Sequence, residues 1–347
     1  RRFGVHSAMA SAEARRLCPQ AIWTHGHFDR YREVSAQVMA ILAEETPRVE
    51  RVSIDEAFID ITPGRFAPVD PLLVARRISD RVAALGVTCS IGVGCNKTVA
   101  KIASERDKPF GLTIVRPGTE QRFLAALPVS AMSGIGRSAE ERLRRMRIYT
   151  LGELSRTPES TLASIFGVNG ERMRQRALGL EISEVTSLDE EREVKSVSNE
   201  RTFAKDLTER GDIEAAIALL GESVGRRLRR QGLTGGTVTL KLKYSYGSGR
   251  SAQRRLPHPT DDENIFVAVA LELLDNIWQE GMHVRLAGIG MSDFDHQGGI
   301  QTDLFCEVDD RGAQSSNRRD LSVAIDAVRD KFGDTALSFG RQSRFND

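Results

Sequence analysis

The spacing of hydrophobic residues changes several times between residues 1 and 116, and each change predicts an element. Apolar residues three or four positions apart indicate a helix, whereas alternation with polar residues indicates a strand. Residues 48–62 alternate and predict two short strands that meet around Asp55 and Glu56 as a hairpin. The other predicted elements are a mostly helical segment 1–27 in which Ser11 caps a helix, a helix 30–44, a helix from Asp70 to Gly86, a strand 87–93, and a helix that Asn96 opens and that ends before Pro109. The order ββαβα is typical of an α+β sheet layer.

After residue 116 the apolar residues recur with helical spacing only. Residues 117–185 keep this spacing and are interrupted by glycines, which predicts a separate small helical domain. Residues 186–194 are charged and show no period, as expected of a linker.

Strands return in residues 195–296. The predicted order is βαββαβ, provided that a short strand lies near 250–256, and it is typical of a split βαβ unit with two helices on one face of a sheet. Residues 297–347 are polar except for one amphipathic segment, so we expect a tail with a single helix. The apolar residues of that segment are Leu321, Ile325 and Val328.

The composition is that of a folded, water-soluble protein. The chain has 347 residues, of which 40% are hydrophobic and 28% charged, enough for two to four domains. It contains neither a run of about eighteen apolar residues nor a signal peptide, so we expect a cytoplasmic protein without a membrane partner. The four cysteines form no CxxC pair, which favours structural thiols over a cysteine-bound metal.

Positive charge is concentrated in one part of a nearly neutral chain. The net charge is +1, yet residues 223–260 contain basic side chains and no Asp or Glu. A local excess of this kind indicates a polyanionic partner. The basic residues are Arg226, Arg227, Arg229, Arg230, Lys241, Lys243, Arg250, Arg254 and Arg255.

Asp55 and Glu56 are the candidate catalytic and metal-binding pair. Neighbouring residues of a regular strand point to opposite faces, so both acids can serve one site only if the backbone turns between them. Magnesium prefers oxygen ligands and keeps waters and substrate phosphates, so two carboxylates could form half of a two-metal site for phosphoryl transfer. On the two acids alone, a solvated turn is the favoured interpretation, because Asp-Glu pairs are common on protein surfaces.

Five short motifs follow one another in the first 111 residues: RRFGV at 1–5, SIDEA at 53–57, GVGCNK at 92–97, AKIAS at 100–104 and KPFG at 108–111. Their order and spacing resemble those of the Y-family DNA polymerases. The chain is identified as a member of this translesion polymerase family, and it most resembles the bacterial polymerase IV branch, up to about residue 305.

The resemblance implies an α+β multidomain architecture. The expected parts are partial fingers at 1–27, a catalytic palm (ββαβα) at 28–116, a helical thumb with a helix-hairpin-helix at 117–185, a linker at 186–194, a little finger (βαββαβ) at 195–296, and a clamp-binding segment and C-terminal tail at 297–347.

The resemblance also assigns roles at the catalytic site. Asp55 is similar to the family carboxylate that binds both Mg²⁺ ions, and Glu56 to the one that binds the catalytic ion near the primer 3′ hydroxyl. Arg1 and Lys108 match the cationic residues that bind the incoming triphosphate. Their charges would neutralise the charge that builds on the leaving pyrophosphate.

Ser7 and Ala8 match the small residues that cover the nascent base pair in the family, and small side chains there would leave room for damaged templates.

The family places three further functional residues upstream of the position of Arg1. They are a metal-binding Asp, an aromatic residue that excludes ribonucleotides, and a triphosphate-binding Tyr. A sheet without that central strand would expose the edges of its neighbours. We therefore expect the chain as written to be inactive, and sugar discrimination, lesion preference and fidelity do not follow from it.

Gly134, Gly136 and Arg137 are candidate DNA-binding residues of the helical domain. A glycine turn at a helix N-terminus presents backbone N–H groups to a phosphate without reading bases. The turn resembles a helix-hairpin-helix, with 165–170 as a weaker copy, although a plain helical turn has the same pattern. The neighbouring arginines Arg142, Arg144 and Arg145 favour binding to a duplex backbone.

Lys241 and Lys243 are candidate DNA-binding residues of the last domain. They alternate with apolar residues in 237–246, so one face of the strand should be core and the other basic; the basic face is either simply solvated or, as in the little finger of the family, grips primer and template.

Gln301, Leu304 and Phe305 belong to a segment that resembles the bacterial sliding-clamp-binding pentapeptide. Adjacent large apolar residues in a polar stretch are typical of a partner site. The resemblance thus implies three partners for an expected monomer: primer-template DNA, deoxynucleoside triphosphates and the clamp.

The leading hypothesis is translesion DNA synthesis by two-metal nucleotidyl transfer. The alternative is a non-catalytic Y-family accessory protein that bridges DNA and the clamp; such proteins tend to lose the acids retained at 55 and 56. A palm-fold nucleotide cyclase would fit ββαβα and the acids but leaves the helical domain and the basic strand unexplained.

Overall fold

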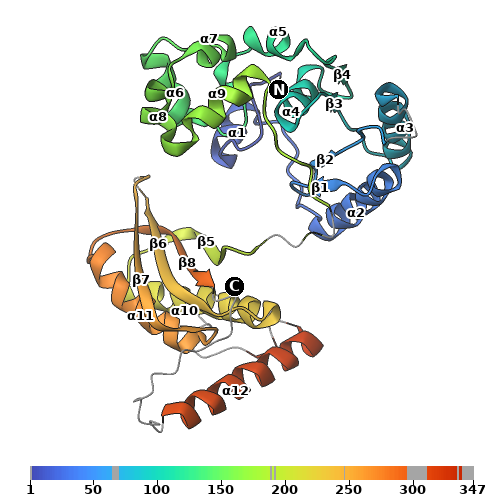
Figure 1. Ribbon diagram of the computed structural model, residues 1–347. Helices are drawn as coiled ribbons and strands as arrows, with labels where there is room; N and C mark the ends of the chain where they lie inside the picture. Colours follow the sequence, from blue (N-terminus) through green and yellow to red (C-terminus); the bar gives the residue numbers. More distant parts are fainter. Residues whose placement is uncertain are drawn as a thin grey trace, which may run out of the picture. The chain divides into compact units, whose positions relative to one another are not determined.

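The computed structural model describes residues 2–64, 70–187, 190, 193–245, 247–294, 311–333 and 336–337, without the side chains of 311–320. The chain divides into two compact units, Arg1–Glu191 and Arg192–Asp347, whose elements are labelled in Figure 1. Each unit is described by itself.

The first part of unit 1 contains two small sheets and the helices that cover them. Strands β1 and β2 pair antiparallel, with Glu50 opposite Phe58, and β3 and β4 pair parallel, with Gly92 opposite Thr113. Helices α2 and α3 pack against β1 through a common apolar core that includes Met39, Val49 and Val74. The elements are α1 Ser11–Leu17, α2 Phe28–Glu45, β1 Val49–Arg51, β2 Ala57–Ile59, α3 Pro71–Ala84, β3 Ile91–Val93, α4 Lys97–Arg106 and β4 Leu112–Ile114.

The predicted order ββαβα is present, but three details of the prediction are wrong. Only Ser11–Leu17 is helical among the described residues up to 27, and Ala10 rather than Ser11 is the N-cap residue. The strand expected at 87–93 covers only Ile91–Val93. A further strand, Leu112–Ile114, was not predicted, because three residues between a glycine and Val115-Arg116-Pro117 are too few to show a period.

Asp70 and Asn96 cap α3 and α4 as predicted. The Asp70 side chain accepts a hydrogen bond from the Leu72 amide, and the Asn96 side chain accepts one from the Val99 amide. Each bond satisfies one of the backbone donors that a helix start leaves unpaired.

The rest of unit 1 is helical, as predicted for 117–185. Thr150 and Glu153 form a reciprocal capping box at the start of α7. Backbone hydrogen bonds from Tyr149 and Thr150 hold the pKa of Glu153 below its usual value. The elements are α5 Glu120–Ala125, η1 Val129–Ala131, α6 Arg137–Arg145, α7 Leu151–Arg156, α8 Glu159–Phe166, η2 Gly167–Asn169 and α9 Gly170–Leu178.

Unit 2 is a four-stranded antiparallel sheet with helices on one face. The strand order is β5-β8-β6-β7, and α10 and α11 share one apolar core with the sheet. The predicted βαββαβ order is confirmed, and the short strand expected near 250–256 is a full strand. The elements are β5 Ser196–Leu207, α10 Arg210–Gln231, β6 Gly235–Tyr244, β7 Gly249–Thr260, α11 Glu263–Ile277, β8 Val284–Phe294 and, after the core, α12 Arg311–Phe332 (Figure 1).

Buried and exposed side chains alternate along β6, so the strand shows which face of the sheet is core and which is open. Val238, Leu240 and Leu242 are fully buried under the helices, whereas Lys241 is half-buried and Lys243 is exposed. An antiparallel sheet can leave one face to solvent in this way. The sheet therefore offers an open face for binding.

None of the described helices is long and apolar enough to cross a membrane.

Substitutions on the two faces of β6 should differ in their effect on stability. Leu240→Ala should lower the free energy of unfolding by about 2–5 kcal/mol because it leaves a cavity in the core. Lys243→Ala, three residues on and exposed, should change it by less than about 0.5 kcal/mol. Urea unfolding of both variants measures this; equal losses would mean that the open face is packed.

Candidate functional site

Asp55 and Glu56 lie at the tip of the β1–β2 hairpin. The amides of Val52 and Ser53 both donate to the Glu56 carbonyl, at 2.9 and 3.2 Å, so both acids lie in the tight turn that joins the two strands. The Ser53 hydroxyl donates to Asp55 Oδ1 at 2.6 Å, which fixes that carboxylate. Ser35 of α2 donates to the Ile54 carbonyl at 2.5 Å and attaches the turn to the core.

A chain of alternating charges leads from Glu56 to Lys108. Lys101 of α4 bonds to Glu56 and lies 3.3 Å from Glu105 Oε1. Lys108 binds the same oxygen of Glu105 at 2.7 Å. The structure thus brings the predicted metal-binding Glu56 and the predicted triphosphate-binding Lys108 into one network, through two residues of α4.

The charge network perturbs the pKa of Lys101. Partial burial alone would lower this pKa, but hydrogen bonds and charge from Glu56 and Glu105 outweigh the burial and leave it above its usual value. Lys101 therefore stays protonated at neutral pH and holds the Glu56 carboxylate in place.

The donor set suits magnesium. Asp55 is exposed and Glu56 half-buried, and a protein commonly supplies one or two carboxylates to Mg²⁺ while substrate phosphates and water complete the shell. Within the described part of the chain, no group of three or more His, Cys, Asp or Glu side chains is arranged to hold a metal. Asp60, which directly follows β2, binds Arg48 at 3.1 Å and the Thr62 amide at 2.9 Å.

Ser7 and Ala8, the other predicted catalytic-site residues that the structure describes, take no part in this network. Ser7 and Ala8 lie in an exposed turn near the N-terminus, where Ala8 has a φ of 63°, a conformation uncommon for a residue other than glycine. Arg1 lies outside the described residues, as do Gln301, Leu304 and Phe305.

Gly134 and Gly136 form the turn that precedes α6. Gly134 has a φ of 96°, and Gly136 is the N-cap residue, with Arg137 first in the helix. A Cβ on Gly136 would meet no atom within 4 Å, so a ligand backbone can approach. Arg176 of α9 donates to the Ser133 carbonyl at 2.8 Å and steadies the turn.

Two of the arginines expected to bind a duplex have intramolecular partners. Arg142 donates to the carbonyl of Ile165 at 3.1 Å and to that of Ser164, so it caps the end of α8. Arg144 pairs with Glu140 at 2.9 Å. Arg137 is 93% exposed and pairs only along its own helix, with Glu141 at 3.1 Å, which leaves it accessible.

The open face of the sheet in unit 2 carries small and polar side chains around a shallow hollow of about 240 Å³. Lys241 Nζ lies 2.8 and 3.0 Å from the two oxygens of Glu200. Their strands β6 and β5 flank β8, where Gly288 is opposite both residues. Lys241 and Glu200 can reach each other across β8 because Gly288 has no side chain. A Cβ at position 288 would lie 2.6 Å from Glu200 Cγ.

Four residues of these sites were not singled out from the sequence. Lys101 and Glu105 are four positions apart on α4, and Lys101 lies inside the AKIAS motif, so helical spacing could have indicated them. Glu200 and Gly288 meet only through sheet pairing between residues 88 positions apart, which no local pattern shows.

Both units match family models. Residues 1–105 match the impB/mucB/samB family, and residues 194–304 match the impB/mucB/samB family C-terminal domain. Asp55 and Glu56 fall within the first match, and Lys241 and Lys243 within the second.

Similar proteins cover most of the chain. DNA polymerase IV of Lactococcus lactis subsp. cremoris is 37% identical over 296 residues, 85% of this chain and 80% of its own. DNA polymerase IV of Dehalococcoides mccartyi is 34% identical over 349 residues, 100% of this chain and 87% of its own.

Solved structures share the fold. A Y-family DNA polymerase chimera of Dbh and Dpo4 has a TM-score of 0.72 at 23% identity, with 84% of each chain covered. DinB from Sulfolobus solfataricus has a TM-score of 0.51 at 22% identity, again with 84% of each chain covered.

The Lys101 network predicts a titration change. Glu56→Gln should lower the pKa of Lys101, because one of the two carboxylates that raise it is lost. Lysine side-chain NMR titration measures this, with Glu44→Gln as control because Glu44 pairs with Arg81. Adding Mg²⁺ should lower the pKa in the unmodified chain and not in Glu56→Gln; no response to the ion would argue against metal binding at Glu56.

Proposed function

This chain belongs to the Y family of DNA polymerases, among the homologues of DNA polymerase IV, and from this premise we propose that it extends a primer on damaged template DNA by two-metal nucleotidyl transfer. The observation that carries the mechanism is the Asp55–Glu56 turn joined to Lys108 through α4. The turn supplies metal ligands and the network supplies a cation for the triphosphate.

Asp55 and Glu56 would hold the two Mg²⁺ ions, together with substrate phosphates and the family's upstream carboxylate. Bound there, magnesium supplies charge neutralisation at the reacting phosphate. Asp55 enters this role already oriented by the Ser53 hydroxyl. Glu56 is oriented by Lys101.

Lys108 and Arg1 would bind the triphosphate of the incoming nucleotide, and Ser7 and Ala8 would contact the nascent base pair. A cation near the leaving pyrophosphate stabilises the charge that develops there. Lys108 is half-exposed beside Glu105, so it can exchange one anion for another. The exposed turn of Ser7 and Ala8 is available to a bound base pair.

The open sheet face and the Gly134–Gly136 turn would hold primer-template DNA by its phosphates. Lys241 and Lys243 present cations on a face free of large apolar side chains along β6. Contacts of this kind position a duplex without reading its sequence. Such a grip suits an enzyme that must accept any template.

Gln301, Leu304 and Phe305 would bind the bacterial sliding clamp. They follow the sheet domain directly in sequence, so clamp binding would keep a DNA-bound domain near the primer end. A non-catalytic accessory protein would need to bind DNA and the clamp but would not need Asp55 and Glu56. Substitution of these two acids therefore distinguishes the polymerase function from the accessory function.

Loss of either acid should abolish synthesis. In the full-length protein, Asp55→Ala or Glu56→Ala should reduce primer extension by at least about a hundredfold, because transition-state stabilisation is lost, while DNA affinity stays nearly unchanged. Asp60→Asn is the matched control, because Asp60 binds Arg48 and the Thr62 amide rather than the turn. Near-normal extension by either alanine variant would refute the assignment of these acids to the catalytic site. No extension by the unmodified full-length protein, with DNA binding intact, would support the accessory role instead.

The Lys241–Glu200 pair predicts changes of opposite sign in DNA binding. Lys241→Ala should weaken binding equally for all sequences and reduce the salt slope by about 1. Glu200→Gln should strengthen binding, because it removes the anion that competes for Lys241. Fluorescence anisotropy from low to moderate salt measures both. Changes of the same sign, or a strong sequence preference, would contradict this use of the open face.

A further inference from the structure

Helix α12 docks on α10 through charges rather than through apolar side chains. Of the apolar residues expected to form its stripe, Leu321 is 59% exposed, and Ile325 and Val328 are only half-buried. Among the described side chains of α12, from Leu321 on, Ser322 and Arg329 are the buried ones. The polar contacts of this interface therefore determine where α12 lies.

One set of these contacts is buried and anchors the helix. Arg229 of α10 binds Asp326 of α12 at 2.7 Å and also bonds to Glu263 of α11. Arg329 of α12 pairs with Glu222 of α10. The side chains of Arg229, Asp326, Glu222 and Arg329 are all at most 13% exposed, so water competes little for them.

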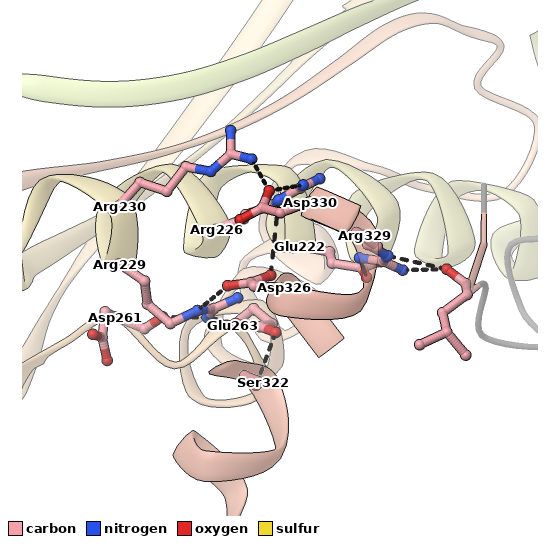
Figure 2. Close-up of polar contacts among 11 residues, drawn as sticks. Glu222, Arg226, Arg229, Arg230, Asp261, Glu263, Ser322, Asp326, Arg329 and Asp330 are labelled. Atoms are coloured by element: carbon pink, nitrogen blue, oxygen red, sulfur yellow. Dashed lines mark hydrogen bonds and ion pairs between the residues drawn. The ribbon is translucent and has the colours of Figure 1, made fainter. Parts of the chain in front are cut away.

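A second set lies at the exposed edge of the interface. Asp330 of α12 binds Arg226 through Oδ1 at 2.6 Å, and the same oxygen bonds to Arg230. The Arg226 side chain is only 12% exposed and also lies 4.0 Å from Asp326. Figure 2 shows the Asp330 carboxylate between the two guanidinium groups. Asp330 and Arg230 are 50% and 55% exposed, and hydrogen bonds from Arg226 and Arg230 lower the pKa of Asp330.

Two arginines one helical turn apart on a single anionic oxygen resemble a phosphate site. Guanidinium groups match the oxygens of carboxylates and phosphates alike. Residues 223–260 carry no acid of their own, so the anion for this pair comes from α12. The basic stretch that indicated a polyanionic partner is thus split: Lys241 and Lys243 face the open side of the sheet, and these arginines lie on the helix side.

We propose that Arg226 and Arg230 are a second binding site for a DNA backbone phosphate, which Asp330 occupies and thereby blocks. The inference rests on the proposed function only in taking DNA as the polyanion. A carboxylate held on the same domain competes at high effective concentration, so the site stays closed to weakly held DNA. The result is a domain that prefers the open sheet face to its opposite side.

The test is Asp330→Asn in the full chain. The two buried anchors of α12 remain, so the helix stays docked. The two arginines lose the carboxylate that they share, although Arg226 still faces Asp326 at 4.0 Å. Binding to a 30-base-pair duplex should become about three- to tenfold tighter at low salt, and its salt slope should steepen by about 0.9 for each phosphate gained. Thermal unfolding checks that the fold is retained.

Asp275→Asn is the matched control. Asp275 is also a half-exposed carboxylate bound to an arginine of α10, Arg210 at 2.7 Å, and Arg210 keeps Glu214 at 2.7 Å. The net charge changes equally in both variants, yet no arginine pair is uncovered. The DNA affinity of Asp275→Asn should stay within about twofold of that of the unmodified chain, because the lost charge uncovers no pair of arginines and an exposed single charge is screened by salt.

The double variant Asp330→Asn with Arg230→Gln should return affinity and salt slope to their original values. The proposal is overturned if Asp330→Asn behaves like Asp275→Asn, or if the gain survives Arg230→Gln. Titration with inorganic phosphate separates the two sources of phosphate: binding of that ion without a gain for DNA would also overturn it. If Lys241→Ala left DNA affinity unchanged while Asp330→Asn raised it, the proposal for the open sheet face would be rejected and this one retained.

Discussion

Two adjacent carboxylates at the tip of a hairpin repel each other, and the ion pair between Glu56 and Lys101 offsets that repulsion. Lys101 comes from α4, which Asn96 caps and which packs on the parallel pair β3–β4. The acids themselves belong to the antiparallel pair β1–β2. The ion pair thus joins two sheets that share no strand, and the position of Glu56 depends on both being folded.

The sheet of unit 2 relies on a different constraint, the strict period of two in β6. Every second residue enters one apolar core beneath α10 and α11, so the residues between them have to face outward. Cations placed at those positions cannot be buried without slipping the strand, which would expose the whole core. The polar face is therefore as strongly determined as the core, although it contributes little to stability.

Local pattern predicted most of the fold. The hairpin tip, the caps at Asp70 and Asn96 and the order βαββαβ all follow from residues within about twenty positions of one another. The pattern failed where elements were too short to show a period, as in Leu112–Ile114, and where partners lie far apart in sequence. The basic stretch shows the second limit: Lys241, Arg229 and Arg230 look alike in the sequence, but sheet pairing and the docking of α12 give them different partners. The roles given to the site residues, from Asp55 and Glu56 to the 301–305 segment, all stay predictions.

The absence of a side chain at Gly288 constrains how the sequence of this sheet can evolve. Glu200 and Lys241 meet only across that glycine, and an added methyl group would displace Glu200. A mutation at 288 is thus tolerated only where the residue at 200 has already been replaced by one with a shorter side chain, and a lysine at 241 then has no inherited partner. We expect these three positions, on three strands, to covary among relatives and to be inherited as a single unit.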